Sequence, residues 1–246
     1  IGHGRSSKKE DYGYFGEKNG WTYLIKNTKK LTHYMKKEYP DVPYFIYGHG
    51  MGSLIVRMDC IHEKGINGVI LSGTSGRQKY CRRRLLFIAI LKRILGAQYK
   101  SVYLQKDLEK RLNHHFLRER DNCSWLVEDE KERKNCSRIY EEYVPITVAA
   151  YEDILKMLAL VSSKKWYRSV NIEIPIMLIG GQEDPIGNFG KGIEEVHRYL
   201  EDSCHRVEMR LYKGMRHNIC DEVRKEAVYI DILQWMKLHL NEQYEI

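Results

Sequence analysis

The sequence feature that most constrains the fold is a short apolar segment that runs through a glycine-rich turn into a helix. Residues 43–46 have the composition of a buried strand, residues 48–52 read Gly-His-Gly-Met-Gly, and residues 53–62 have the spacing of a helix. This is the setting in which the motif G-x-S-x-G holds a serine nucleophile at the tip of a sharp turn. Here the tip is Gly50. The local fold of a nucleophile elbow is therefore predicted, but without a hydroxyl this position cannot form an acyl-enzyme.

Further strand and helix patterns alternate along the chain. Buried strands are predicted at 68–72 and 175–179, and an alternating strand at 207–212. A helix is predicted from about 190 to 200. Two amphipathic helices are marked by apolar residues at three- and four-residue spacing: Trp21, Leu24, Ile25, Thr28, Leu31 and Met35 in the first, and Val223, Ala227, Ile230 and Leu233 in the last. This alternation predicts an α/β fold with a mainly parallel sheet.

Residues 77–165 interrupt this alternation. The segment is helical in pattern, highly charged and free of strong strand signals. It follows the second predicted strand, so we expect it to form a helical insertion between two parts of one α/β core.

Three candidate site residues each come just after a predicted strand. Gly50 follows the first strand, Asp184 the third and His217 the fourth. The carboxyl ends of parallel strands lie at one edge of a sheet, so these residues are expected to meet there. Acyl transfer needs a nucleophile, a histidine that takes its proton and an acid that orients the histidine. Alone, an Asp-Pro turn or a loop histidine is usually structural, but all three in this order favour a catalytic arrangement.

The charge of the chain is concentrated in one segment. The net charge is +8, whereas residues 77–120 hold thirteen Lys and Arg against three Asp and Glu, a net of +10. A basic surface of this kind fits anionic lipid, an acidic substrate, nucleic acid or simply a solvated helical face. No nucleic-acid-binding motif is present, so we expect no nucleic acid partner.

Composition also bears on the compartment. No apolar run approaches the ~20 residues of a membrane span, and no secretory signal peptide is evident. Six cysteines lie far apart with no CxxC pair, a pattern typical of reduced thiols in the cytoplasm, with an exported protein as the alternative. A zinc site of His114, His115, Cys123 and Cys136 fits no common ligand spacing.

Several segments together resemble one family. They are 2–6 (Gly-His-Gly-Arg-Ser), 11–16 (Asp-Tyr-Gly-Tyr-Phe-Gly), 48–53 (Gly-His-Gly-Met-Gly-Ser), 71–76 (Leu-Ser-Gly-Thr-Ser-Gly), 184–187 (Asp-Pro-Ile-Gly) and Arg216-His217. On these residues the chain resembles the monoacylglycerol lipase and lysophospholipase group of α/β hydrolases (serine aminopeptidase S33-like), in its bacterial branch.

This resemblance implies the roles of individual residues. Asp184 would be the triad acid, His217 the general base, and the backbone N–H of Met51 an oxyanion donor. The substrates would be monoacylglycerols, lysophospholipids or related small esters, with no metal or cofactor. Residues 1–76 and 166–246 would form the hydrolase core, and 77–165 the cap (lid) over the active site.

Two departures from the family pattern matter. The family has serine at the position of Gly50, and it has about two to four strands, one oxyanion loop among them, before the segment that opens this chain at Ile1. Such a chain is expected to be N-terminally truncated. The strand at 43–47 would then lose its neighbour and become an exposed apolar edge that favours association.

These observations leave three functional alternatives. The chain is an ester hydrolase made inactive or degenerate by Gly50, a non-catalytic protein that binds a lipid or a partner, or a gene fragment without its own function. The apolar stretch 85–91, flanked by arginine and lysine, either rests on an anionic membrane or packs on the core.

Overall fold

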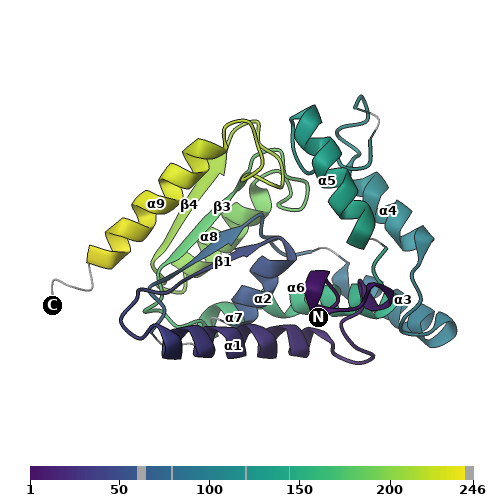
Figure 1. The fold of residues 1–246 in the computed structure, drawn as a ribbon, viewed down its shortest axis with the longest axis horizontal. Helices are drawn as coiled ribbons and strands as arrows, with labels where there is room; N and C mark the ends of the chain where they lie inside the picture. The colour runs from purple at the N-terminus through teal and green to yellow at the C-terminus, as the bar shows by residue number, and fades with distance from the viewer. Residues whose placement is uncertain (60–64, 79, 120, 144, 242–246) are drawn as a thin grey trace.

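The computed structural model describes residues 1–59, 65–78, 80–119, 121–143 and 145–241 (Figure 1). Its centre is a four-stranded parallel sheet in the order β1-β2-β3-β4. The strands are β1 (Phe45–His49), β2 (Gly68–Ser72), β3 (Ile176–Gly181) and β4 (Val207–Tyr212). The predicted α/β class is confirmed, and β2 and β4 have the predicted bounds. Both β1 and β3 begin slightly later than predicted and run on into the glycines that follow them.

Helices cover both faces of this sheet. α1 (Trp21–Glu38), α2 (Met51–Asp59) and α8 (Lys191–Glu201) lie on one side, and α9 (Lys225–Asn241) covers the other (Figure 1). Successive strand residues point to opposite faces, so Leu71 packs with α2 and α8 while Ile70 packs with α9. Both faces of β2 and β3 are buried, which is why these strands read as continuous apolar runs.

The segment between β2 and β3 is helical, as predicted. It contains α3 (Cys81–Leu95), α4 (Val102–Leu112), α5 (Glu130–Tyr143), α6 (Val148–Val161) and α7 (Lys164–Ser169). Elsewhere, two short 3-10 turns, Gly4–Ser6 and Lys9–Asp11, precede α1. In Figure 1, α4 and α5 stand apart from the sheet, whereas α6 lies beside α2. Met157 of α6 belongs to the main core, and Val148 packs with α3 and α4. The division into a core and a cap at residue 165 stays a prediction.

The predicted buried faces of the first and last helices are partly wrong. In α1, Leu24 and Ile25 are buried as predicted, but Leu31 is exposed and its neighbour Thr32 is buried. In α9, the buried residues are Val228, Trp235 and His239, whereas the predicted stripe of Val223, Ala227, Ile230 and Leu233 faces solvent. Apolar residues of α9 lie on all of its faces, so their spacing along the sequence does not identify which face is buried. The aromatic contact of Trp235 with Phe45 of β1, with ring centroids 5.9 Å apart, lies on the buried side.

The apolar stretch 85–91 has one side chain packed on the core and others exposed. Ile88 is buried against Leu104 and Val148, so α3 does pack on the rest of the molecule. Leu86, Phe87 and Ile90 are exposed on the same helix. The helix predicted at 53–62 is described as far as Asp59, and the remainder of that prediction lies outside the described residues.

Candidate active site

The turn after β1 has the geometry of an elbow. Gly50 has a φ of +54°, the left-handed region that L side chains adopt only with strain. Its N–H donates to the carbonyl oxygen of Ser72 at 3.0 Å, and its own carbonyl accepts from the Ser53 N–H at 3.1 Å. Met51 begins α2, so its backbone N–H is one of the donors at a helix start that have no partner within the helix.

Asp184 and His217, predicted from the sequence, lie in direct contact. Oδ2 of Asp184 is 2.9 Å from Nδ1 of His217, and both side chains are buried. The other carboxylate oxygen accepts the N–H of Ile186 at 2.8 Å. Because a carboxylate only accepts hydrogen bonds, Nδ1 carries the proton and Nε2 is left as an acceptor. This is how an acid orients a histidine that acts as a base.

The free nitrogen of His217 faces Gly50. A Cβ placed on Gly50 would lie 3.0 Å from Nε2 of His217. A Cβ on Gly73, which also has a positive φ of +56°, would lie 2.8 Å from Cε1 of the same ring. Two glycines therefore approach the imidazole closely. The structure thus brings together all three positions that the order along the chain had singled out.

Two aromatic rings enclose His217. The centroid of His49 is 4.5 Å from that of His217, and the centroid of Trp125 is 5.1 Å away. Nothing in the local sequence of Trp125 links it to residue 217. The contact arises because the segment between α4 and α5 lies against the loop that carries His217.

His49 has a structural environment of its own. Nδ1 is 3.1 Å from the hydroxyl of Ser72, and Nε2 is 3.1 Å from Oδ1 of Asn218. Burial, and then the charge of the neighbouring His217, lower the pKa of His49 to about 4. His49 is therefore neutral near pH 7 and connects the elbow to the segment that carries His217.

Arg216 links the segment between α4 and α5 to the loop that carries His217. Its Nη1 donates to Glu119 at 2.7 Å and to the carbonyl oxygen of Ser124 at 2.5 Å, and its guanidinium lies 4.1 Å from the ring centre of Phe116. The next residue, His217, donates its N–H to the carbonyl oxygen of Trp125 at 3.3 Å. The resemblance marked Arg216 as family-like, but its partners in that segment had no sequence signal.

Hydroxyl groups near the elbow all have other partners. Ser53 donates to the carbonyl oxygen of Gly50 and to Thr74, and Ser72 contacts His49. Ser75 donates to the carbonyl oxygen of Gly76 and accepts from Gln78. All four hydroxyls therefore take part in hydrogen bonds within the fold.

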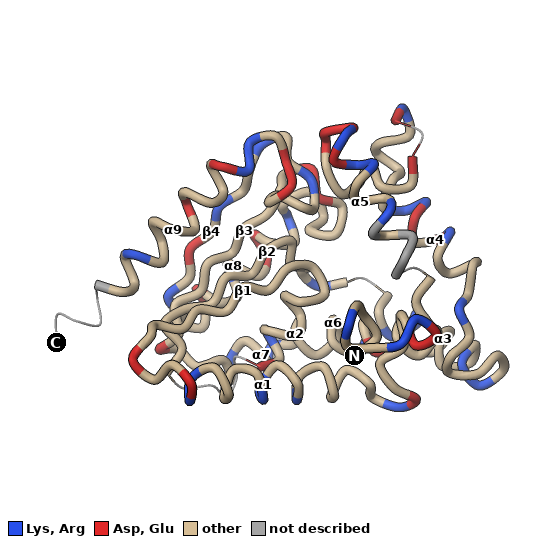
Figure 2. Tube along the Cα trace, viewed as in Figure 1, with Lys and Arg blue, Asp and Glu red and all other residues tan. Residues whose placement is uncertain are grey.

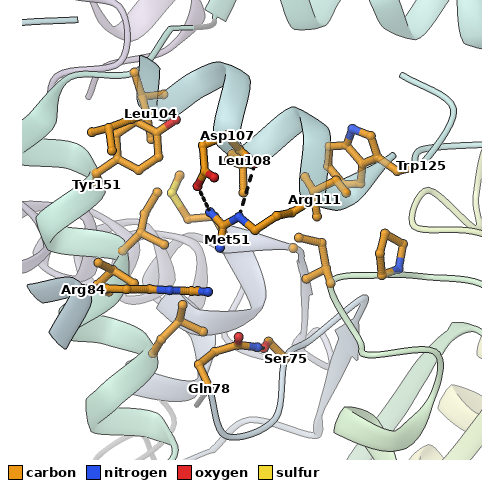
Figure 3. A pocket seen from close by; sticks show the side chains of 18 of the residues that line it. Met51, Ser75, Gln78, Arg84, Leu104, Asp107, Leu108, Arg111, Trp125 and Tyr151 are labelled. Carbon is orange, nitrogen blue, oxygen red and sulfur yellow. Dashed lines mark hydrogen bonds and ion pairs between the residues drawn. The ribbon is translucent and has the colours of Figure 1, made fainter. Parts of the chain in front are cut away.

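A cavity of about 680 Å³ opens beside these residues (Figure 3). Gly50, Met51 and His217 line one part of it, together with Trp125. Most of the remaining lining is apolar, from α3, α4 and α6: Phe87, Ile88, Leu104, Leu108, Leu112, Ile154, Leu155 and Leu158. A hollow of this size and polarity can hold a single acyl chain next to the histidine.

The zinc alternative finds no support within the described ranges. His114 and His115 contact each other with ring centroids 5.1 Å apart, but Cys123 is buried in a separate apolar cluster with Trp125. In those ranges, no three His, Cys, Asp or Glu side chains come together as metal ligands. Likewise, among residues 1–59, 65–78, 80–119, 121–143 and 145–241, no helix has both the length and the hydropathy to span a bilayer.

Comparison with a family model decides the assignment. The model described as serine aminopeptidase, S33, matches residues 1–224. The chain belongs to this family of α/β hydrolases. None of the curated proteins compared with this S33 chain matches it.

Solved structures show the same fold. A thermostable carboxyl esterase from Bacillus coagulans is 24% identical with a TM-score of 0.85, and the match covers 98% of this chain and 78% of the esterase. A monoglyceride lipase from Saccharomyces cerevisiae is 20% identical with a TM-score of 0.71, covering 97% and 75% of the two chains. A monoacylglycerol lipase from Paleococcus ferrophilus is 17% identical with a TM-score of 0.61, covering 87% and 76%. At these identities, the similarity establishes the fold of this chain. Its chemistry has to be inferred from the residues of the site.

Proposed function

We propose that this protein binds a single-chain acyl ester, of the monoacylglycerol or lysophospholipid class, in the site of a serine ester hydrolase whose covalent step is blocked at Gly50. The main support for this proposal is the position of the two ring nitrogens of His217. Asp184 holds Nδ1 at 2.9 Å, while Nε2 lies 3.0 Å from where a Cβ of residue 50 would be. In this proposal His217 is the base and Asp184 the acid, and residue 50 lacks the oxygen that they would activate.

In this proposal each group keeps a defined role. The cavity holds the acyl chain, the Met51 N–H at the start of α2 faces the carbonyl oxygen, and Asp184 orients His217. Without a hydroxyl at residue 50, no acyl-enzyme forms. Loss of the nucleophile in a serine hydrolase removes about 10⁶ in kcat and leaves the part that binding and the oxyanion donors provide.

Covalent labelling tests this proposal. The wild-type protein, Gly50→Ser and the double variant Gly50→Ser/His217→Ala are treated with an alkyl fluorophosphonate and assayed with a lauroyl ester. We expect no label on wild type, one label at residue 50 in Gly50→Ser together with measurable hydrolysis, and loss of both in the double variant, because the serine then has no base. Labelling of the wild type, or a folded Gly50→Ser variant that takes no label, would contradict the proposal.

A second role, contact with an anionic membrane, is favoured by the outer face of α3. Leu86, Phe87, Ile90 and Ile94 are exposed, and Phe87 also lines the cavity. Arg82, Arg83 and Arg93 are exposed on the same helix, and Lys and Arg (blue in Figure 2) recur along α3 and α4. An exposed apolar stripe with basic flanks is typical of helices that lie in a membrane surface. The cavity beside it would then receive lipid directly.

Vesicle flotation tests the membrane contact. The protein should float with phosphatidylcholine vesicles that contain a quarter phosphatidylglycerol and much less with phosphatidylcholine alone. Ile94→Glu should reduce flotation, whereas Leu117→Glu, an equally exposed position of the cap outside α3, should not. Equal flotation with both vesicles, or equal effects of the two variants, would exclude this role.

A further inference from the structure

Three charged side chains stand together in the otherwise largely apolar lining of the cavity. They are Arg84 of α3 and Asp107 and Arg111 of α4. Nη2 of Arg111 is 3.0 Å from Oδ2 of Asp107, and Nε of Arg111 donates to the carbonyl oxygen of the same residue. Figure 3 shows the guanidinium of Arg84 extending into the cavity below this pair. Two guanidinium groups thus face one carboxylate, so the cavity wall has an excess of positive charge.

Arg84 shares its acidic neighbour, Asp107, with Arg111. The carboxylate of Asp107 is paired directly with Arg111, so it offsets only part of the positive charge of the two guanidinium groups. Burial lowers the pKa of Arg84, and the charge of Arg111 lowers it further. An arginine remains protonated even so. A half-buried cation in an apolar wall is costly unless an anion approaches it, so the site favours a negatively charged ligand group.

Within this cluster, Arg84 lies across the cavity from Trp125 (Figure 3). Arg111 lies between the two in this view. Trp125 contacts His217, with ring centroids 5.1 Å apart, so its side of the cavity is the side of the reacting carbonyl. A ligand whose ester lies at His217 would therefore reach Arg84 with a part remote from that ester.

This inference rests on the proposed function, because it concerns a ligand of the same cavity. We propose that the ligand carries an anionic group, a phosphate or a carboxylate, remote from its ester, and that Arg84 binds this group with Arg111 beside it. The planar guanidinium donates two parallel hydrogen bonds to either anion, which an uncharged glyceride cannot accept with equal strength. Lysophospholipids and monoesters of long dicarboxylic acids share this chemistry, and monoacylglycerols lack it.

Binding calorimetry with matched ligands tests this inference on the wild-type chain, which does not consume them if the proposed function holds. The probes are 1-lauroylglycerol, 1-lauroylglycerol 3-phosphate and the monomethyl ester of dodecanedioic acid, all below their critical micelle concentrations. We expect at least one anionic probe to bind about tenfold more tightly than the neutral one, since a charge-assisted hydrogen bond is worth at least one decade of affinity. The stronger of the two anionic probes distinguishes phosphate from carboxylate.

Variants separate the cluster from the overall charge of the protein. Arg84→Gln should remove the preference for the anionic probe and leave 1-lauroylglycerol binding unchanged. Arg83→Gln is the matched control, because it removes the same charge from an exposed position of α3 outside the cavity lining. Asp107→Asn should strengthen the preference by removing the competing carboxylate.

Three outcomes are decisive against the inference. If 1-lauroylglycerol binds as tightly as both anionic probes, the anion site is disproved and the proposed function stands. If Arg84→Gln behaves like Arg83→Gln, the preference comes from net charge and not from the cavity. If none of the three probes binds, the inference fails together with the acyl cavity on which it rests.

Discussion

Gly50 has a left-handed backbone and a close neighbour in Nε2 of His217. A side chain here must accept strain at φ +54° and displace the imidazole by a few tenths of an ångström. We therefore expect Gly50→Ser and Gly50→Ala to lower the free energy of unfolding by about 1–2 kcal/mol each, the usual cost of this conformation. Urea denaturation measures both. The alanine variant separates strain from the hydroxyl, and a Gly50→Ala protein as stable as wild type would show that the elbow relaxes.

His49 makes a pH-dependent contribution to stability. Its pKa is about 4 in the folded protein, because of burial and then His217, and about 6.5 when unfolded. Between these values the unfolded chain binds more protons, so this contribution is complete above pH 6.5 and is lost as the pH falls toward 4. The loss amounts to at most about 3 kcal/mol.

The difference between two proteins isolates this effect from other titrating groups. The free energy of unfolding of wild type and His49→Gln is measured by urea titration from pH 7.5 to pH 4. Wild type should lose more stability over this range than the variant. Parallel curves would mean that His49 becomes protonated in the folded state without penalty.

At the scale of elements, hydrogen bonds connect the segment between α4 and α5 to the loop after β4. Arg216 bonds Glu119 and Ser124, and Glu222 accepts the N–H groups of both Glu128 and Arg216. Breaking such a half-buried charged network typically costs about 2 kcal/mol. The histidine is therefore positioned in part by contacts that this segment supplies.

The variant Arg216→Ala tests this coupling. We expect faster amide hydrogen exchange both in 116–128 and in 215–219, because each segment loses contacts that hold the other. Arg118→Ala is the control, since it removes an exposed arginine from the same segment between α4 and α5. Faster exchange in 116–128 alone would show that the loop with His217 is held independently.

At the scale of the whole molecule, sequence patterns predicted those features that depend on residues close together in the chain. The alternation of strands and helices and the order Gly50, Asp184, His217 were visible because strand ends and turns are encoded by neighbouring residues. The contact of Trp125 with His217 and the partners of Arg216 depend on how the segment between α4 and α5 lies against the loop after β4, so no window of sequence contains them. The buried face of α9 was predicted wrongly for a related reason. Apolar residues lie on all faces of that helix, and only its packing against the sheet determines which of them are buried.

Two exposed features of the fold favour self-association. β1 lies at the edge of the sheet, with β2 as its strand partner within the described ranges, and its Tyr47 is 44% exposed. On α9, Ile230 and Leu233 are more than half exposed. Unpaired strand edges and apolar patches are the usual sites of association between copies of a chain.

Sedimentation velocity should therefore show association that increases with protein concentration. The double variant Ile230→Lys/Leu233→Lys should reduce it, because two charges on α9 oppose burial of this face. Leu31→Lys/Tyr34→Lys is the matched control, since both side chains are at least as exposed but lie on α1, across the sheet. If the control reduces association equally, net charge is responsible. A wild-type protein that stays monomeric at every concentration would mean that neither the edge of β1 nor the outer face of α9 attracts a second copy.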